Sequence, residues 1–244
     1  MSDEKNEILE FINVDFGYDT EKLILKNICL KLEKGKTYAL VGPTGGGKST
    51  TAGLMVRLYD PLEGVVEFKN QDIRSFPPEE LAKSIGFILQ EPFLFTGTVG
   101  YNITYGNPEI ENITSLELEK LLIEKGLQEL ISKFEKGLDT EIEASSENIS
   151  LGQKQLIAFI RILLRSPELL ILDEATANID TVTEKLLTEI INKLPTQTTK
   201  VIIAHRLNTI KQADQILFIN AGKIQQALDF EDAIKLIDGS KRTS

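Results

Sequence analysis

A glycine-rich octapeptide, Gly42-Pro-Thr-Gly-Gly-Gly-Lys-Ser49, gives the strongest indication of chemistry in the sequence. It fits the pattern G-x-x-x-x-G-K-[ST] and lies between an apolar run, Tyr38–Val41, and a helical pattern from Gly47 to Arg57. Glycines let consecutive backbone N–H groups turn inward, and the helix start adds a favourable dipole, so this loop can wrap the phosphates of a nucleotide. We expect Lys48 to neutralise the β- and γ-phosphates and Ser49 to place its hydroxyl on Mg²⁺. The alternative, a glycine-rich turn that matches by chance, is disfavoured by the strand–loop–helix context.

Two adjacent carboxylates, Asp173 and Glu174, follow the apolar run Leu169–Leu172. They are expected at the carboxyl edge of a sheet, where open α/β sheets bind ligands. Side chains alternate along a strand, so Asp173 can join the shell of Mg²⁺ while Glu174 accepts a proton from an attacking water. His205, the single histidine, follows the run Val201–Ala204 at the same expected edge. Alone, these residues could be solvated strand ends or a structural histidine; the glycine-rich loop upstream favours the functional interpretation.

The elements that must position these residues alternate along the chain. Short apolar runs typical of buried parallel strands occur at Tyr38–Val41, Phe87–Leu89, Leu169–Leu172 and Val201–Ala204. Helical patterns between them occur at Gly47–Arg57, Gly152–Arg165 and Thr181–Lys193 and predict an α/β core with right-handed crossovers. Alternation within Ile12–Phe16 and Ile28–Leu32 predicts strands of an antiparallel sheet.

These patterns predict a P-loop NTPase core with a mostly parallel sheet, an N-terminal antiparallel β subdomain and an inserted α-helical subdomain. We expect one domain over residues 1–244. The core and β subdomain would cover about 8–89 and 166–228, the helical subdomain about 91–165, and a C-terminal tail 229–244.

Composition narrows the class of protein. The longest apolar run, Leu156–Ile160, is far too short to cross a bilayer, and residues 1–7 lack the features of a secretory signal, which predicts a cytosolic domain. A single cysteine, Cys29, and a single histidine argue against a disulfide or a cysteine- or histidine-rich metal site. The net charge is −10 with scattered basic residues, so we expect no nucleic-acid partner. An anionic ligand must therefore be bound by a short local segment rather than by a basic surface.

From about Ile8 to Leu228 the sequence resembles, motif by motif and in order, the nucleotide-binding domain of ATP-binding cassette (ABC) transporters, most closely the exporter type. The segment Asn148-Ile-Ser-Leu-Gly-Gln-Lys-Gln155 is similar to the family signature L-S-G-G-Q, which other P-loop proteins lack. Further matches are Tyr18 for the adenine-stacking aromatic, Gln90 for the Q-loop, Ala177-Asn-Ile-Asp180 for the D-loop and His205 for the switch histidine.

The resemblance implies an ATPase that uses ATP and Mg²⁺ and dimerises head to tail, so that each ATP lies between the P-loop of one chain and the signature of the other. Implied catalytic residues are Glu174 as general base, His205 at the γ-phosphate and Gln90. Implied Mg²⁺ ligands are Ser49, Gln90 and Asp173. Residues implied at the nucleotide are Tyr18, Gly42, Pro43, Thr44, Gly45, Gly46, Gly47, Lys48, Ser49, Thr50, Asp173 and Asp180, with Ser150, Gly152 and Gln153 reaching the partner's γ-phosphate.

The signature departs from the family pattern at two positions, Ile149 and Leu151, and the preceding Ala144-Ser-Ser-Glu147 lacks the usual glycines. We expect a working but weakened contact across the dimer; the alternative is a heterodimeric exporter to which this chain donates an impaired signature. A soluble ABC ATPase outside transport is a further alternative, although it would usually carry coiled-coil arms or a second cassette. A kinase would need an arginine-rich lid, and a non-hydrolysing module would be expected to lose Glu174 or His205.

A membrane partner is implied by Glu91–Val99, which resembles the exporter segment that meets the coupling helices of the membrane domain. We expect this contact near Gln90–Thr98, which places the domain at the cytoplasmic face of a membrane. The alternative is that Phe93, Leu94 and Phe95 only pack the subdomain core. Membrane helices would lie upstream or on another chain, and the start of the resemblance near Ile8 favours an excised domain.

Overall fold

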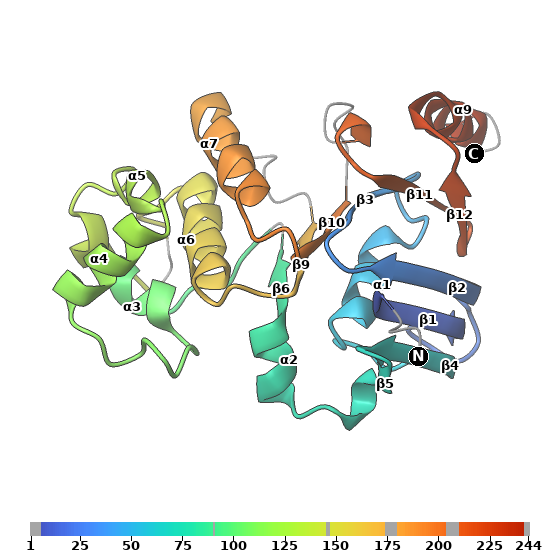
Figure 1. The fold of residues 1–244 in the computed structure, drawn as a ribbon, viewed down its shortest axis with the longest axis horizontal. Helices are drawn as coiled ribbons and strands as arrows, with labels where there is room; N and C mark the ends of the chain where they lie inside the picture. The colour runs from blue at the N-terminus through green and yellow to red at the C-terminus, as the bar shows by residue number, and fades with distance from the viewer. Residues whose placement is uncertain (1–5, 90, 145–146, 174–179, 204–209, 242–244) are drawn as a thin grey trace. The chain divides into compact units, whose positions relative to one another are not determined.

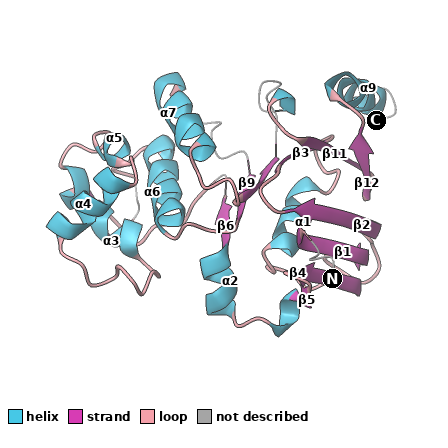
Figure 2. Ribbon diagram, in the orientation of Figure 1, coloured by secondary structure: helices cyan, strands magenta, loops and turns pink. Residues whose placement is uncertain are grey.

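The computed structural model describes residues 6–89, 91–144, 147–173, 180–203 and 210–241, which form two compact units. The first unit consists of Met1–Phe87, Glu168–Glu174 and Pro195–Ser244, and the second of Ile88–Pro167 and Ala175–Leu194. The first unit contains the larger sheets, and the second is almost entirely helices and loops (Figure 2).

A six-stranded sheet in the order β12-β11-β3-β10-β9-β6 forms the centre of the α/β fold (Figure 1). Its strands are β3 (Thr37–Val41), β6 (Ile85–Ile88), β9 (Leu169–Asp173), β10 (Thr199–Ile203), β11 (Gln215–Asn220) and β12 (Lys223–Ala227). β10 pairs in parallel with β3 and β9, β11 pairs in parallel with β3, and β12 is antiparallel to β11. The predicted mostly parallel sheet is confirmed, with β11 and β12 as strands that the sequence patterns had not identified.

The predicted antiparallel sheet is also confirmed. Its strands are β1 (Glu7–Phe16), β2 (Leu25–Glu33), β4 (Glu63–Phe68) and β5 (Gln71–Asp72), in the order β2-β1-β4-β5. The expected alternation breaks at Ile12, which is only partly buried, whereas Phe11 and Val14 are buried. The register of β1 against β4 shifts between Ile12 and Asp15, and Asn13 has a φ of 49°, so one residue is taken up in a bulge.

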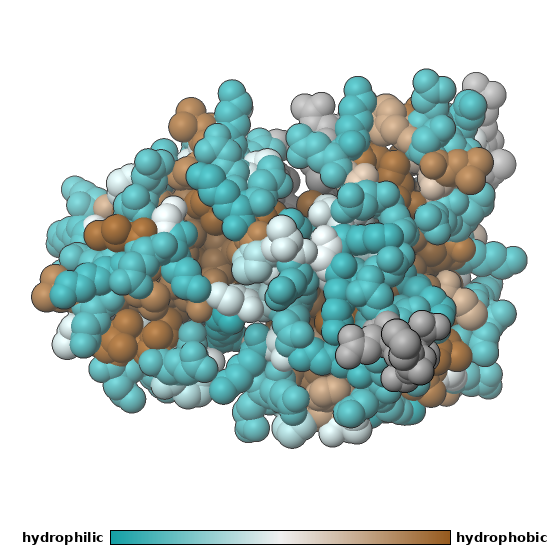
Figure 3. Space-filling view, in the orientation of Figure 1, coloured by the Kyte–Doolittle hydropathy of each residue, from teal (hydrophilic) through white to brown (hydrophobic). Residues whose placement is uncertain are grey.

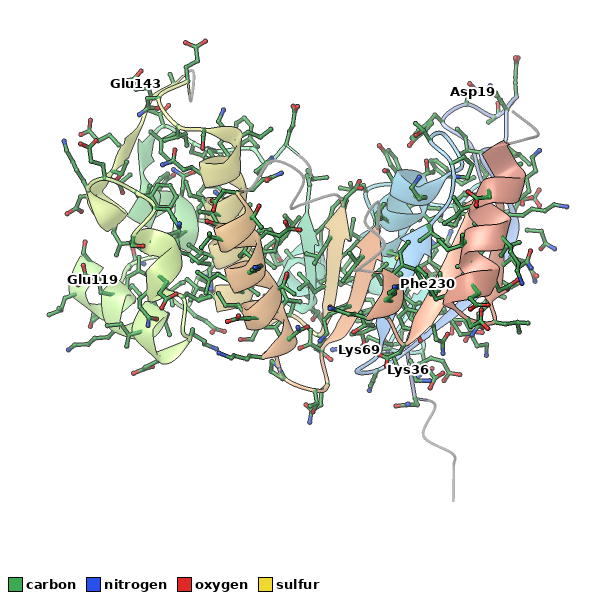
Figure 4. All side chains as sticks on the ribbon, turned by 90° about the horizontal axis from the view of Figure 1, so that it is seen from above. Asp19, Lys36, Lys69, Glu119, Glu143 and Phe230 are labelled. Atoms are coloured by element: carbon green, nitrogen blue, oxygen red, sulfur yellow. The ribbon has the colours of Figure 1, made fainter. Side chains whose placement is uncertain are left out.

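The core of the first unit explains why β3 lacks charged residues and is buried from Tyr38 to Val41. Tyr38 and Leu40 belong to a cluster shared with the antiparallel sheet and helix α1 (Lys48–Met55), which lies beside β1, β2 and β4 (Figure 1). Ala39 and Val41 point to the other face and pack with helix α9 (Phe230–Lys241). Figure 4 labels Phe230 at the start of α9. From Tyr38 to Val41 the strand is therefore buried on both faces, as expected for a parallel sheet.

Among the described residues, the first unit also contains the 3₁₀ turn η1 (Ile73–Ser75) and α2 (Pro78–Ser84). The second unit contains α3 (Val99–Thr104), α4 (Ser115–Glu124), α5 (Gln128–Ile131), α6 (Leu151–Leu164), α7 (Thr181–Asn192), the turn η2 (Gly137–Asp139) and the short pair β7 (Gly97–Thr98) and β8 (Glu141–Ile142). The long predicted helices thus agree with α1, α6 and α7 to within a few residues.

Among the described residues, no helix combines the length and apolarity needed to span a bilayer. The face drawn in Figure 3 is mostly hydrophilic, with small apolar areas scattered between polar side chains.

Candidate functional site

The glycine-rich loop connects β3 to α1, and its backbone is set by glycine geometry. Gly42 has a φ of 148°, and a Cβ there would lie 1.9 Å from the carbonyl oxygen of Ile219 on β11. Gly47, the N-cap of α1, has a φ of 110°. The Gly46 N–H donates to the Pro43 carbonyl at 3.1 Å, which closes the loop on itself. The loop is therefore pre-formed, with its chain turned into the start of α1.

Lys48 lies inside this loop. Its side chain is 7% exposed, and its Nζ donates to the carbonyl oxygens of Gly42 and Pro43 at 3.0 Å each. The ammonium group is thus held among the backbone groups of the predicted phosphate loop. Ser49 is exposed at the first turn of α1, and Thr50 is buried. The arrangement suits a polyanion, because a fixed cation and helix N–H groups lie within one short segment.

Strand register brings Asp173 to the same edge of the sheet as the loop. Ile203 on β10 pairs with Leu40 on β3 and with Asp173 on β9, so these residues form one row across the sheet. Gly42 begins the loop two residues after Leu40. The carboxyl ends of the three strands therefore meet where the sequence predicts the ligand.

Mg²⁺ fits the donors at this edge. No cluster of three or more His, Cys, Asp or Glu residues occurs among the described residues. Mg²⁺ bound with a nucleotide does not need one, because it keeps several waters and uses one or two carboxylates with substrate phosphates. The Ser49 hydroxyl and the Asp173 carboxylate are hard oxygen donors of the required kind.

Tyr18 contacts the first turn of α1, directly after the loop. Its hydroxyl and Thr50 Oγ1 lie 3.1 Å apart, although the residues are far apart in sequence. The Tyr18 side chain is 60% exposed, so most of its surface remains accessible to a ligand. The structure thus brings together two residues that the sequence analysis predicted at the nucleotide.

The signature residues lie in the second unit, at the start of α6. Ser150 is the N-cap: its Oγ accepts from the Gln153 N–H at 3.2 Å, and Gln153 Oε1 accepts from the Ser150 N–H at 2.9 Å. Gln153 Nε2 also donates to the carbonyl of Lys133 at 2.9 Å. Leu151 and Gly152 occupy the first turn and are partly exposed. This capping box fixes the start of a helix whose N–H groups point toward solvent or a ligand.

Asp180 caps the next helix, α7, in the same unit. Its Oδ1 accepts from the N–H groups of Val182 at 3.2 Å and Thr183 at 3.1 Å. Hydrogen bonding from Thr183 lowers the pKa of the Asp180 carboxyl, so the cap is anionic at neutral pH.

The segment expected to meet a membrane domain is tied down by Asn102. Its side chain accepts from the Phe95 N–H at 2.8 Å and donates to the carbonyls of Phe95 and Thr98 at 2.8 and 3.1 Å. Leu94 is buried, as the core-packing alternative anticipated for at least one residue, whereas Phe93 is 71% exposed. The loop therefore has a fixed base and an exposed aromatic side chain.

Arg161 on α6 supports the same loop and was not identified from the sequence. Its Nε donates to the Asn102 carbonyl at 2.6 Å, and its NH2 lies 3.3 Å from Asn102 Oδ1. Burial, with a smaller contribution from Arg165, lowers the pKa of Arg161 to about 10. An arginine on a helical pattern carries no local signal for this role, because its acceptors come from α3.

Three predicted catalytic residues, Gln90, Glu174 and His205, lie outside the described residues, as do Ala177–179 of the predicted D-loop. Their roles stay predictions.

Comparison with known proteins gives a consistent result. Residues 25–177 match the ABC transporter family. The chain is 40% identical over 241 residues to an uncharacterized ABC transporter ATP-binding protein of Bacillus subtilis, YfiC, covering 96% of this chain and 39% of the relative. It is 38% identical over 228 residues to a probable multidrug resistance ABC transporter ATP-binding/permease protein of the same organism, YheH, covering 93% and 33%.

Among solved structures, a bacterial Atm1-family ABC exporter with ATP bound is similar with a TM-score of 0.84 at 33% identity. The match covers 98% of this chain and 42% of the exporter chain. The chain therefore spans less than half the length of each of these three relatives.

Proposed function

The chain belongs to the ABC transporter family as an exporter-type ATP-binding domain, and we propose that it forms half of a head-to-tail dimer that hydrolyses Mg-ATP to power export through a membrane domain. The observation that carries the proposal is the loop of Gly42–Ser49 around Lys48, at the same sheet edge as Asp173. Selectivity for the transported substrate would lie in the membrane domain.

Binding of ATP would begin at the loop. Lys48 Nζ, which now donates to two loop carbonyls, would turn part of its donor capacity to the β- and γ-phosphates. Hydrogen bonds to charged groups contribute about 1.5–3 kcal/mol each, so a phosphate oxygen competes well with a neutral carbonyl. Tyr18 would stack on the adenine, and Thr50 would face the phosphates beside it.

Hydrolysis would use groups at the sheet edge. Ser49, Asp173 and Gln90 would hold Mg²⁺, which when bound neutralises charge on the phosphates. Glu174, directly after Asp173, would accept the proton of the attacking water, and His205 would hold the γ-phosphate in line with it.

The signature half would act on the ATP of the partner chain. The cap at Ser150 uses a lone pair of the hydroxyl, so its O–H can donate to a γ-phosphate oxygen. The N–H of Leu151 points the same way as that of a glycine at this position, because helix geometry sets its direction. The leucine side chain adds bulk at the expected dimer contact, and this specific departure favours the second candidate, a heterodimeric exporter in which this signature is impaired.

Coupling to export would use the segment Gln90–Thr98. Asn102 and Arg161 hold its base, and Phe93 is presented to solvent at 71% exposure. We propose that coupling helices of a transmembrane domain bind here, with this domain at the cytoplasmic face of the membrane.

Complementation between two variants tests the composite site. Lys48→Ala disables the loop half and leaves Ser150, whereas Ser150→Arg blocks the signature half and leaves Lys48. Each variant alone is expected to be nearly inactive in phosphate release. A mixed dimer contains one site with both halves intact, so mixing restores activity to below the parent level.

The structure supplies a matched control, because Ser150 is also the N-cap of α6. Ser150→Ala and Ser150→Arg remove the same cap and should unfold at similar temperatures, but only the arginine fills the space for the partner's phosphate. Activity of Ser150→Ala should therefore exceed that of Ser150→Arg. A mixture no more active than the sum of its components, with an active parent, contradicts the donated signature; a parent that dimerises but is inactive supports the heterodimeric candidate.

A further inference from the structure

Three aromatic side chains meet at the predicted base-binding residue. The ring of Tyr18 lies edge-on to Phe16 and to Tyr59, with centroid distances of 5.3 Å in both pairs. Phe16 and Tyr59 also lie 5.3 Å apart. Phe16 belongs to the buried core, whereas the Tyr59 side chain is 40% exposed. Tyr18 is thus supported from one side by a fixed core ring and from another by a surface ring.

The backbone that carries Tyr18 is itself constrained. Asp19 Oδ1 accepts from the N–H groups of Glu21 at 3.1 Å and Lys22 at 2.8 Å, and Asp19 is labelled on this loop in Figure 4. A Cβ at Gly17 would lie 2.3 Å from the Lys22 carbonyl oxygen, so the loop is tightly closed. With the backbone held, the orientation of the Tyr18 ring depends on the side chains around it.

One face of α1 supports this ring at two points. Thr50 and Gly53 are three residues apart and therefore share a face of the helix. Thr50 Oγ1 meets the Tyr18 hydroxyl. At Gly53, an added Cβ would lie 3.0 and 3.1 Å from Cε2 and Cδ2 of Tyr59, so the missing side chain lets the Tyr59 ring pack directly on the helix.

The end of α1 returns Tyr59 to that face. The Leu58 N–H donates to the Gly53 carbonyl at 2.8 Å, and the Arg57 N–H donates to the Leu54 carbonyl at 3.1 Å. Arg57 has a φ of 56°. This is a Schellman motif, in which the left-handed residue reverses the chain over the last helical turn. The guanidinium of Arg57 donates to the Phe76 carbonyl at 3.0 Å, which fixes the reversed chain.

We infer that Tyr59, seated on Gly53, is a positioning residue for Tyr18, so that α1 aligns the base-stacking ring with the phosphate loop at its own N-terminus. The inference rests on the proposed function only in that Tyr18 receives the base. Its physical basis is that ring pairs in edge-to-face contact restrict each other's orientation. A Tyr18 ring without this neighbour would sample orientations that do not stack, which weakens binding of any ligand with a base and leaves phosphate binding unchanged.

The test compares ligands with and without a base. Dissociation constants are measured by calorimetry for Mg-ATP and for Mg-tripolyphosphate, using the full chain and the variants Tyr18→Ala, Tyr59→Ala, Tyr59→Phe and Gly53→Ala. Tyr59→Ala should weaken ATP binding about three- to tenfold, the range expected for one aromatic pair, without changing tripolyphosphate binding. Tyr59→Phe keeps the ring and should bind like the parent. Gly53→Ala keeps every ring but shifts Tyr59 by a few tenths of an ångström, and should weaken ATP binding less than Tyr59→Ala does.

The double variant Tyr18→Ala/Tyr59→Ala distinguishes a role of Tyr59 that acts through Tyr18 from a general contribution of Tyr59 to the fold. In the Tyr18→Ala background, Tyr59→Ala should have no further effect on ATP binding. If Tyr59→Ala weakens both ligands equally, or weakens neither, the inference is overturned. If Tyr18→Ala leaves ATP binding unchanged, the role of Tyr18 in the proposed function is wrong, and that failure is recognised without reference to Tyr59. Thermal unfolding of each variant verifies that the chain remains folded.

Discussion

Replacing Gly42 by alanine should damage the phosphate loop far more than the same replacement at Gly45. A Cβ on Gly42 would lie 1.9 Å from the Ile219 carbonyl oxygen, and the φ of 148° is one that L-residues rarely adopt. At Gly45 the φ is 76°, but nothing lies within 4 Å of an added Cβ. Both variants add one methyl group to the same loop, but only Gly42→Ala places it in a clash with the Ile219 carbonyl oxygen.

The expected loss of stability in Gly42→Ala has two contributions, the unfavourable backbone conformation and the steric clash. A residue in a sparsely populated backbone region costs about 1–3 kcal/mol, and overpacking against a fixed neighbour costs a further 1–3 kcal/mol or so. Relief of the clash would require Ile219 to move by about 1 Å in a close-packed interior, and β11 is hydrogen-bonded to β3 at this point. We expect Gly42→Ala to lower the free energy of unfolding by roughly 2–6 kcal/mol, against about 1 kcal/mol for Gly45→Ala.

Urea denaturation without nucleotide measures both values independently of any ligand. In Gly42→Ala, ATP binding should be lost even where the domain remains folded, because the substitution distorts the loop directly. Equal destabilisation by the two substitutions, or a Gly42→Ala variant within about 0.5 kcal/mol of the parent, would refute the contact with Ile219 as the reason for glycine at this position.

Two further predictions concern the second unit. Asn102→Ala should lower the free energy of unfolding by about 1–3 kcal/mol, because it leaves partly buried backbone groups of Phe95 and Thr98 without their partner. It should also speed amide exchange at Phe95, and exchange as slow as in the parent would contradict the anchoring role. For Asp180, the folded-state pKa is lowered from 3.8, so its capping contribution is present above that value and is lost as pH falls through the folded pKa. Asp180→Asn should make the stability of α7 less sensitive to acid. Hydrogen exchange of the Thr183 amide, measured between neutral pH and about pH 3, tests this expectation. An unchanged pH profile would rule out this titration.

The parts of the site that the sequence predicted are those encoded within a few consecutive residues. The backbone of Gly42–Ser49 is determined by its own glycines and by the helix that follows, so its sequence pattern specifies its shape. The capping box of Ser150 and Gln153 is equally local in sequence, although only a phosphate-binding role was predicted for those residues. β11 was not predicted, although its residues 216–219 form a buried apolar run like those of the other parallel strands.

Other features were hidden because unusual residues occupy turn positions. Lys69 and Asn70, with φ values of 52° and 62°, form the two-residue turn between β4 and β5, where a glycine would have indicated a hairpin. Arg57 takes the left-handed position at the end of α1, where glycine is usual. The position of Tyr59 depends on the turn at Arg57, and the hydrogen bond from Arg161 to Asn102 depends on packing between distant segments, so no local pattern predicts them.

The charge of the chain explains why such local geometry matters for function. With a net charge of −10, the molecule as a whole repels a nucleotide polyphosphate at long range. Surface charges are screened within about 10 Å at moderate salt, whereas Lys48 is almost fully buried and its field on the loop is screened much less. Binding must therefore come from short-range donors whose positions are fixed before the ligand arrives. We propose that the closed loop, the start of α1 and the support of Tyr18 by the same helix provide those fixed positions.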